Sequence, residues 1–188
     1  MKKIALFGTS ADPPTAGHQK IIKWLSQHYD WVAVWAADNP FKEQQTPLPH
    51  RAAMLNLLIT DIQAPLGNIS LEQELSSWRT LETLEKAKLR WGNDVEYTLV
   101  IGSDLVIQLP RWYHIEDLLK QVKLLVIPRP GYVIDNISLE KIRELGGKIA
   151  IASLTGLDVS STAFREQKDH QTLTPPVIDY IYREKLYV

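Results

Sequence analysis

Residues 5–25 read ALFGTSADPPTAGHQKIIKWL and contain three successive signals. A short apolar run ends at Gly8, a turn-rich segment with two prolines follows, and Gly17 and His18 then begin a pattern with apolar residues three, four and seven positions after the histidine. These signals predict a strand, a tight turn and an amphipathic helix. Because free N–H groups at a helix start can face an anion, this order of elements is typical of a phosphate-binding turn.

The best-known phosphate-binding fingerprints are missing from the sequence. No G-x-G-x-x-G follows the first strand, and no G-x-x-x-x-G-K-[ST] occurs anywhere in the chain. These absences argue against a dinucleotide-binding fold of the usual kind and against a P-loop ATPase. The turn is therefore predicted to be a nucleotide-binding loop that differs from both the dinucleotide-binding loop and the P-loop.

The composition narrows the class of protein. The 188 residues carry a formal net charge of -1, which argues against a general affinity for nucleic acid or an anionic membrane. Cysteine is absent, so disulfides, a thiol nucleophile and a thiolate zinc site are excluded. The first apolar run is too short for a signal peptide, and no segment approaches the roughly 20 apolar residues of a membrane span. We expect one globular domain over residues 1–188, located in the cytoplasm.

Apolar runs of strand length alternate with helical patterns along most of the chain. Strands are expected at Lys3–Phe7, Trp31–Ala36, Ile69–Leu71, Tyr97–Ile101, Lys123–Ile127 and Lys148–Ile151. Helices are expected at His18–His28, His50–Thr60, Arg79–Trp91, Ile115–Gln121 and Leu139–Leu145. This alternation predicts an α/β fold with a Rossmann-like open, mainly parallel sheet and helices on both faces.

The C-terminal part, residues 160–188, has a different pattern. It reads as a helix, a polar loop and a last helix that starts near Pro176, with no further strand. Proline is favourable in the first turn of a helix. We expect a small helical extension that packs against an edge of the sheet.

From the residues alone, His18 has two interpretations. It leans toward the apolar face of its helix, where a buried histidine bonded to a backbone group is at least as common as one that binds a ligand. Gly17, however, lets a ligand approach the backbone closely, and Thr15 offers a hydroxyl in the loop above. These two neighbours favour a functional role for His18.

The same residues resemble the first motif of the nucleotidylyltransferase superfamily, (H/T)-x-G-H, which is TAGH at residues 15–18. The second motif of that superfamily is similar to SSTAFR at residues 160–165, about 140 residues later and in the expected order. Two such motifs in the right order are much harder to obtain by chance than either one alone.

The resemblance covers most of the chain and is closest to the bacterial nicotinate-mononucleotide adenylyltransferases. That family has a lysine-bearing loop similar to NPFKEQ (39–44), an arginine helix similar to HRAAML (50–55) and a G-x-D…W segment similar to IGSDLVIQLPRW (101–112). Its R-P-G turn is similar to IPRPGY (127–132).

The resemblance implies a set of site residues. Those expected to be catalytic are Thr15, His18 and Arg165. The expected ATP-binding residues are Gly8, Thr9, Ser10, Gly17, Lys42, Gly102, Asp104, Ser160, Ser161 and Thr162. The expected mononucleotide-binding residues are Arg51, Trp78, Thr83, Trp112 and Arg129. Mg²⁺ is expected to accompany ATP, held mostly by phosphates and water, because no dedicated metal cage is visible in the sequence.

Several of these residues also have an ordinary structural interpretation. The serines at 160 and 161 can be a plain helix N-cap, and Asp104 can cap the short helix after it. Lys42 can be a solvated lysine, Arg51 a surface charge and Trp112 a packing residue. Asp12, which precedes a proline, is expected to serve the turn and not catalysis.

The resemblance implies an enzyme that joins ATP and nicotinate mononucleotide, giving nicotinate adenine dinucleotide and pyrophosphate in NAD biosynthesis. Direct adenylyl transfer needs positive charge and oriented N–H groups around the phosphates, and it needs no activated serine or cysteine. Two alternatives remain open: transfer to nicotinamide mononucleotide, pantetheine phosphate or another phosphorylated acceptor, and a non-catalytic nucleotide-binding regulator. A nucleic-acid-binding module is disfavoured because the chain lacks a basic excess.

Overall fold

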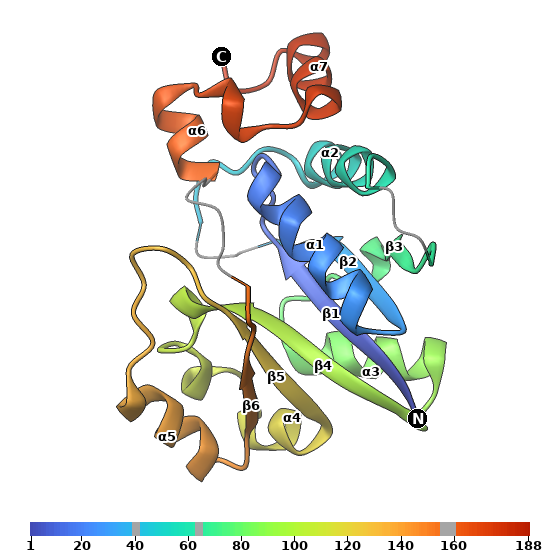
Figure 1. Cartoon of the computed structure of the whole chain (residues 1–188), viewed down its shortest axis with the longest axis vertical. Helices are drawn as coiled ribbons and strands as arrows, with labels where there is room; N and C mark the ends of the chain where they lie inside the picture. Colours follow the sequence, from blue (N-terminus) through green and yellow to red (C-terminus); the bar gives the residue numbers. More distant parts are fainter. Residues whose placement is uncertain (39–41, 63–65, 155–160) are drawn as a thin grey trace.

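A computed structural model of the chain describes residues 1–38, 42–62, 66–154 and 161–188 (Figure 1). Within these residues, six strands form one sheet in the order β3-β2-β1-β4-β5-β6, and every neighbouring pair is parallel. The strands are β1 (Lys2–Thr9), β2 (Trp31–Ala36), β3 (Ile69–Leu71), β4 (Val95–Gly102), β5 (Val122–Ile127) and β6 (Lys148–Ile151). The expected α/β fold is confirmed, and each expected strand is present.

Helices cover both faces of the sheet. They are α1 (Ala16–His28), α2 (Leu48–Thr60), α3 (Thr80–Trp91), α4 (Ile115–Gln121), α5 (Asn136–Glu144), α6 (Ser161–Gln167) and α7 (Pro175–Glu184). In the described part of the chain, none of the helices combines the length and apolarity that crossing a membrane requires.

The central strand β1 is buried on both of its faces, as the uniformly apolar run in the sequence indicated. Ala5 and Phe7 belong to the hydrophobic core beneath α1 and α2, whereas Ile4 and Leu6 belong to the core beneath α3, α4 and α5. Figure 1 shows these two helical layers on opposite sides of the sheet. Since alternate side chains of a strand point to opposite faces, a strand with two cores must be apolar at every position.

The strand order places a ligand site at one edge of the sheet. Because β1 lies between β2 and β4, the connections from β1 to β2 and from β4 to β5 run in opposite directions. In open α/β sheets this reversal leaves a crevice at the carboxyl ends of the strands. Gly8 and Thr9 end β1 at this edge, and Gly102 ends β4 there.

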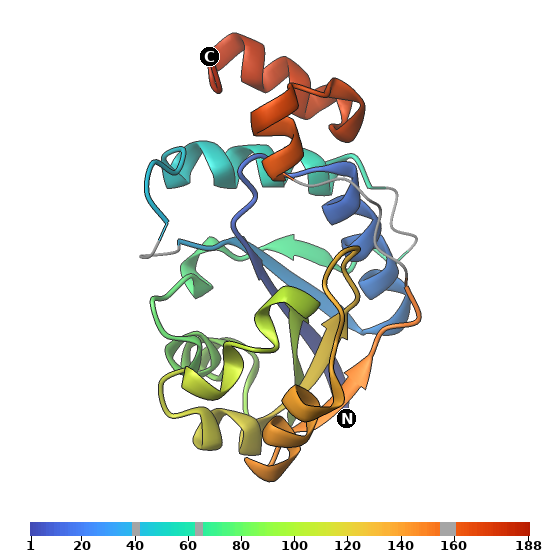
Figure 2. The same cartoon turned by 90° about the vertical axis from the view of Figure 1, so that its left-hand side faces the viewer.

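The C-terminal helices do not pack where we expected them. Instead of contacting an edge strand of the sheet, α7 packs against α2, and Figures 1 and 2 show both C-terminal helices beyond the carboxyl end of the sheet. Val177 and Ile181 of α7 enter the same core as Met54 and Leu58 of α2. The apolar stripe of α7 is therefore buried on another helix, and this places α6 above the crevice.

Candidate active site

The start of α1 holds the imidazole of His18 in one orientation. The N–H of Thr15 donates to Nδ1 of His18 at 2.9 Å, and Oγ1 of Thr15 lies 3.0 Å from the same nitrogen. Because Nδ1 accepts a backbone N–H, the proton of the neutral ring belongs on Nε2. His18 therefore has a hydrogen-bond donor left for a ligand.

His18 is a neutral donor and not a cation. Burial, together with the positive charge of Arg129, lowers the pKa of His18 from 6.5 to about 4. The ring is therefore uncharged near neutral pH, and what it can offer an anion is a hydrogen bond from Nε2. The bond to the backbone of Thr15 expected of a buried histidine therefore leaves Nε2 available for the expected functional role.

The two sequence motifs meet in the fold. The guanidinium of Arg165, on α6, donates from Nη1 to the carbonyl oxygen of Asp12 at 2.6 Å. Ser161 donates its hydroxyl to the carbonyl oxygen of Pro13 at 2.7 Å. The loop after β1 and the start of α6 are therefore in direct contact, although about 150 residues separate them in the sequence.

These bonds change what the serine motif can do. The hydroxyl of Ser161, an expected phosphate ligand, donates to the carbonyl oxygen of Pro13 and so fixes this serine against the loop after β1. Thr162 accepts from Nη2 of Arg165 at 3.2 Å and so orients that guanidinium. Ser160, the other expected phosphate ligand of this motif, lies outside the described residues.

A cavity of about 260 Å³ lies between the loop after β1, the segment before α2, and α6. Its lining includes Ser10, Asp12, Lys42 and Arg165. Nζ of Lys42 donates to Oγ of Ser10 at 3.2 Å. Partial burial lowers the pKa of Lys42, and the positive charges of Arg165 and Arg129 lower it further. Cations held this close repel one another, and a bound anion would relieve the repulsion.

The carboxyl ends of β4 and β5 complete the crevice. A Cβ on Gly102 would lie 2.5 Å from a carboxylate oxygen of Asp104, so a larger residue there would displace that carboxylate. Asp104 pairs with the guanidinium of Arg129 at 3.1 Å, and the N–H of Arg129 donates to Oγ of Ser103 at 2.8 Å. Asp104 thus orients an arginine whose side chain is 41% exposed and free to meet a ligand.

The glycine that ends the first apolar run in the sequence has a packing role. A Cβ on Gly8 would lie 2.5 Å from the indole of Trp35, which is itself buried in β2. Glycine at this position therefore leaves the space beside β1 that the indole occupies. Gly17 is buried in the first turn of α1, beside His18.

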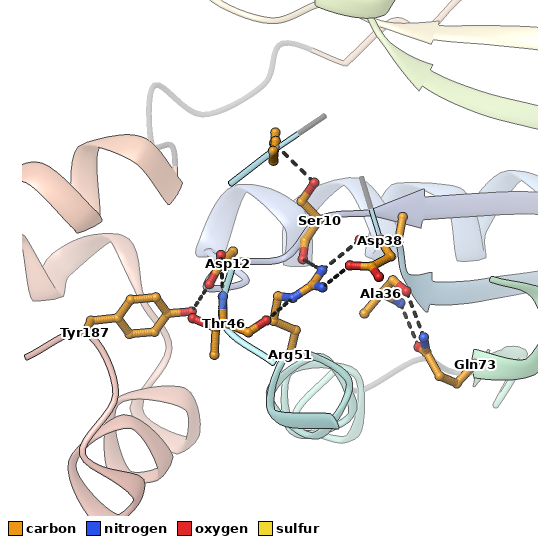
Figure 3. A network of polar contacts seen from close by, with 10 residues as sticks. Ser10, Asp12, Ala36, Asp38, Thr46, Arg51, Gln73 and Tyr187 are labelled. Carbon is orange, nitrogen blue, oxygen red and sulfur yellow. Dashed lines mark hydrogen bonds and ion pairs between the residues drawn. The ribbon is translucent and has the colours of Figure 1, made fainter. Parts of the chain in front are cut away.

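Arg51, which we expected to bind the mononucleotide, makes several bonds within the protein. Its side chain is 1% exposed, and Figure 3 shows it at the centre of a polar network. It donates to the carbonyl oxygens of Ser10 at 3.0 Å, Ala37 at 2.7 Å and Thr46 at 2.7 Å. It also pairs with Asp38 at 2.8 Å. Four of its five N–H donors have partners within the protein, so Arg51 holds the loops after β1 and β2 to the start of α2.

Thr83, an expected mononucleotide-binding residue, is buried, and its hydroxyl donates to the carbonyl oxygen of Leu75 at 2.7 Å. This bond fixes the turn before α3. Trp78 has the opposite environment, with 74% of its surface exposed. Trp112 is half-buried and packs against the core beneath α3 to α5. The two tryptophans remain candidates for contact with a flat ring.

Sequence reasoning missed Gln73 and Tyr187, and it assigned Asp12 only to the turn, whereas all three residues organise this edge. Asp12 is buried, and its carboxylate accepts from the hydroxyl of Tyr187 and from the N–H of Thr46. Gln73 makes two hydrogen bonds of 2.8 Å to the backbone of Ala36 and pins the segment after β3 to the end of β2 (Figure 3). No local pattern marks Gln73 or Tyr187, because their partners lie far away in the sequence.

Replacing Arg51 by methionine is expected to lower the free energy of unfolding by about 3 kcal/mol or more, because buried carbonyl groups lose their donors. Chemical denaturation measures this loss. The matched control is Arg143→Met, because Arg143 pairs with Glu140 on the exposed surface of α5 and should contribute less than about 1 kcal/mol. A stable Arg51→Met protein that had lost only ligand affinity would contradict this assignment.

The low pKa of His18 predicts how stability changes with pH. As pH falls below 6.5, the unfolded chain takes up a proton at His18, whereas the folded chain does so only near pH 4. His18 therefore stabilises the fold above pH 6.5, and this contribution is lost as pH falls toward 4. Between about pH 6.5 and 4.5, wild type should lose about 2 kcal/mol more than His18→Gln in urea denaturation. Equal losses in the two proteins would refute the buried neutral ring.

A parallel sheet whose crevice joins a T-x-G-H helix start to a second, arginine-bearing helix defines a nucleotidyltransferase. In agreement, the family model for cytidylyltransferase-like proteins matches residues 6–167. A Synechocystis protein named "Probable nicotinate-nucleotide adenylyltransferase" is 43% identical over 98% of each chain. The Bacillus subtilis nicotinate-nucleotide adenylyltransferase is 29% identical over 99% of this chain and 94% of its own.

The chain belongs to the nicotinate-nucleotide adenylyltransferase family. A solved structure of Plasmodium falciparum nicotinic acid mononucleotide adenylyltransferase complexed with NaAD superimposes with a TM-score of 0.83, at 23% identity, covering 100% of this chain and 98% of that one. At 23% identity, the similarity to this solved structure supports the fold only. The assignment to the family depends on the family model and the sequence relatives.

Proposed function

We propose that this chain transfers the adenylyl group of ATP to the phosphate of nicotinate mononucleotide, as a step of NAD biosynthesis in the cytoplasm. An oxygen of the mononucleotide phosphate forms a bond to the α-phosphorus as the bond from that phosphorus to the bridging oxygen breaks, and pyrophosphate leaves. The observation that carries the proposal is the contact between the loop after β1 and α6, which brings Lys42 and Arg165 to one cavity.

The cavity suits the β and γ phosphates of ATP. Lys42 and Arg165 line it together, and each lowers the cost of holding the pyrophosphate charge that grows as the reaction proceeds. Nη2 of Arg165, which donates to Thr162, can also donate to a phosphate oxygen. The bond to Thr162 keeps the plane of the guanidinium fixed. Ser10 holds Lys42 at the rim and is a further candidate for a phosphate contact.

His18 and Thr15 suit the α-phosphate, because they stand at the start of α1 beside the end of β1. Thr15 orients the ring through Nδ1, which leaves the Nε2–H to donate to a phosphoryl oxygen as negative charge develops there. A neutral donor needs no change of protonation during transfer, so in-line displacement can proceed without a general base on His18.

The acceptor side of the crevice is proposed to involve Arg129, Trp78 and Trp112. Arg129 can meet the phosphate of the mononucleotide, since it is oriented by Asp104 and lies close enough to His18 to influence its pKa. An exposed aromatic face suits a flat pyridine ring. We retain Trp78 and Trp112 as candidates for that contact.

We propose that Mg²⁺ enters with ATP and is bound by phosphate oxygens and water. The ion would offset negative charge on the departing pyrophosphate. Within the described residues there is no cluster of three or more histidine, cysteine, aspartate or glutamate side chains suited to a metal ion. Lys42 and Arg165 provide the protein's own positive charge at the cavity.

The acceptor is tested by incubating the pure protein with ATP, Mg²⁺ and one acceptor at a time. Pyrophosphate release is expected with nicotinate mononucleotide, and kcat/KM should be lower with nicotinamide mononucleotide and with pantetheine phosphate. Activity with pantetheine phosphate alone would overturn the proposed acceptor. Binding of ATP with no turnover on any acceptor would favour the nucleotide-binding regulator instead.

The proposed roles of His18 and Arg165 separate in steady-state kinetics. His18→Ala should lower kcat by about 10²- to 10³-fold, as for the loss of one transition-state donor, with little change in KM for ATP. Arg165→Ala should also raise KM for ATP by about tenfold or more, because a charged hydrogen bond to phosphate is lost. Arg165→Lys keeps the charge and serves as the control. Near-normal turnover in His18→Ala would refute its role.

A further inference from the structure

The segment after α7 returns to the loop that follows β1. The hydroxyl of Tyr187 donates to one carboxylate oxygen of Asp12, and the N–H of Thr46 donates to the other at 3.2 Å (Figure 3). Asp12 therefore joins three segments that are remote in the sequence: the loop after β1, the segment before α2, and the C-terminal end of the chain.

Tyr187 is also attached to α6, the helix that carries Arg165. Its ring packs edge-on against Phe164, with ring centroids 5.7 Å apart and an angle of 90° between the planes. Its carbonyl oxygen accepts from Nζ of Lys168, one residue beyond the end of α6. Its φ of 59° lies in the left-handed region, which costs energy for a residue other than glycine and needs such contacts to persist.

The hydroxyl of Tyr187 is a permanent donor. Burial and the adjacent Asp12 carboxylate raise the pKa of Tyr187 well above its usual range, so the phenol keeps its proton throughout the physiological pH range. The phenol is therefore the donor in this bond, and a side-chain oxygen of Asp12 is the acceptor.

Asp12 lies between the tail and both cations of the phosphate cavity. Its carbonyl oxygen accepts from Arg165, while its carboxylate holds Thr46. Thr46 in turn accepts from the buried Arg51, which also binds the carbonyl oxygen of Ser10, the residue whose hydroxyl accepts from Lys42. A displacement of Asp12 would therefore be transmitted to both Arg165 and Lys42.

We propose that Tyr187 is a positioning residue for the triphosphate end of the active site, acting through Asp12. The inference rests on the proposed function, because the cavity is taken to hold the β and γ phosphates of ATP. Without the hydroxyl, the carboxylate keeps one donor instead of two, and the positions of Arg165 and Lys42 become less defined. The acceptor end, around Arg129, should be unaffected.

Tyr187→Phe tests this directly, since it removes the hydroxyl and keeps the ring on Phe164. KM for ATP should rise by about fivefold or more, while KM for nicotinate mononucleotide stays within about twofold of wild type. Calorimetric titration with a non-hydrolysable ATP analogue should show the same loss of affinity. The matched control is Tyr182→Phe, because the hydroxyl of Tyr182 lies 3.2 Å from Nε2 of His170 at the surface. It should leave both KM values unchanged.

A double-mutant cycle distinguishes an effect through Asp12 from a general loss of structure, because it measures the coupling of the two residues in KM for ATP. If Tyr187 acts through Asp12, then Tyr187→Phe should change KM for ATP little in an Asp12→Asn background. If the single tyrosine variant folds poorly, Asp12→Asn by itself tests the proposal, because it should raise KM for ATP selectively. Equal rises in both KM values, no rise in KM for ATP, or full additivity in the cycle would each overturn the proposal.

Failure of the proposed function gives a different result. Wild type would then release no pyrophosphate from ATP and nicotinate mononucleotide, whatever the state of Tyr187. The ATP-analogue titration compares Tyr187→Phe with wild type without turnover, so it reports on the tail contact even in that case.

Discussion

The active-site edge of this protein depends on one buried charge. The guanidinium of Arg51 donates to three backbone carbonyl groups, from Ser10, Ala37 and Thr46, and pairs with Asp38. Strands that end at a crevice leave backbone acceptors without partners, and an unpartnered buried polar group costs about 1–3 kcal/mol. One arginine satisfies several of these acceptors and so holds the loops after β1 and β2 in one arrangement. The cavity that contains Lys42 forms between these loops and α6.

The adenylyltransferase must bring two anionic substrates together, and its site divides the electrostatic task between two kinds of group. Lys42, Arg129 and Arg165 provide fixed positive charge, and a bound phosphate would relieve their mutual repulsion. His18 provides a neutral donor, because burial and Arg129 keep its ring unprotonated. A site of this kind stabilises developing charge without moving a proton, which fits direct displacement at phosphorus.

The C-terminal helices belong to the site and are not an appendage at the sheet edge. The apolar stripe of α7 packs on α2, and this packing leaves α6 above the crevice, where Arg165 and Ser161 bind the carbonyl groups of Asp12 and Pro13. Tyr187, near the end of the chain, donates its hydroxyl to the carboxylate of Asp12 and so joins the C-terminal segment to the same loop. The phosphate cavity is therefore built from the first loop and the last helices of one chain.

The sequence by itself determined the fold class, the strands and the two motifs. A strand that is covered on both faces must be apolar at every position, and the helix and turn signals around residues 5–25 are local, so both can be read from neighbouring residues. Only the tertiary structure decided what Arg51, Thr83, Ser161 and Tyr187 do. Each has a polar group whose partner comes from a segment remote in the sequence or across a turn, and the same residue type could equally have faced a ligand. Whether a polar side chain serves the substrate or the protein depends on which acceptors the folded chain brings beside it, and that information is not local.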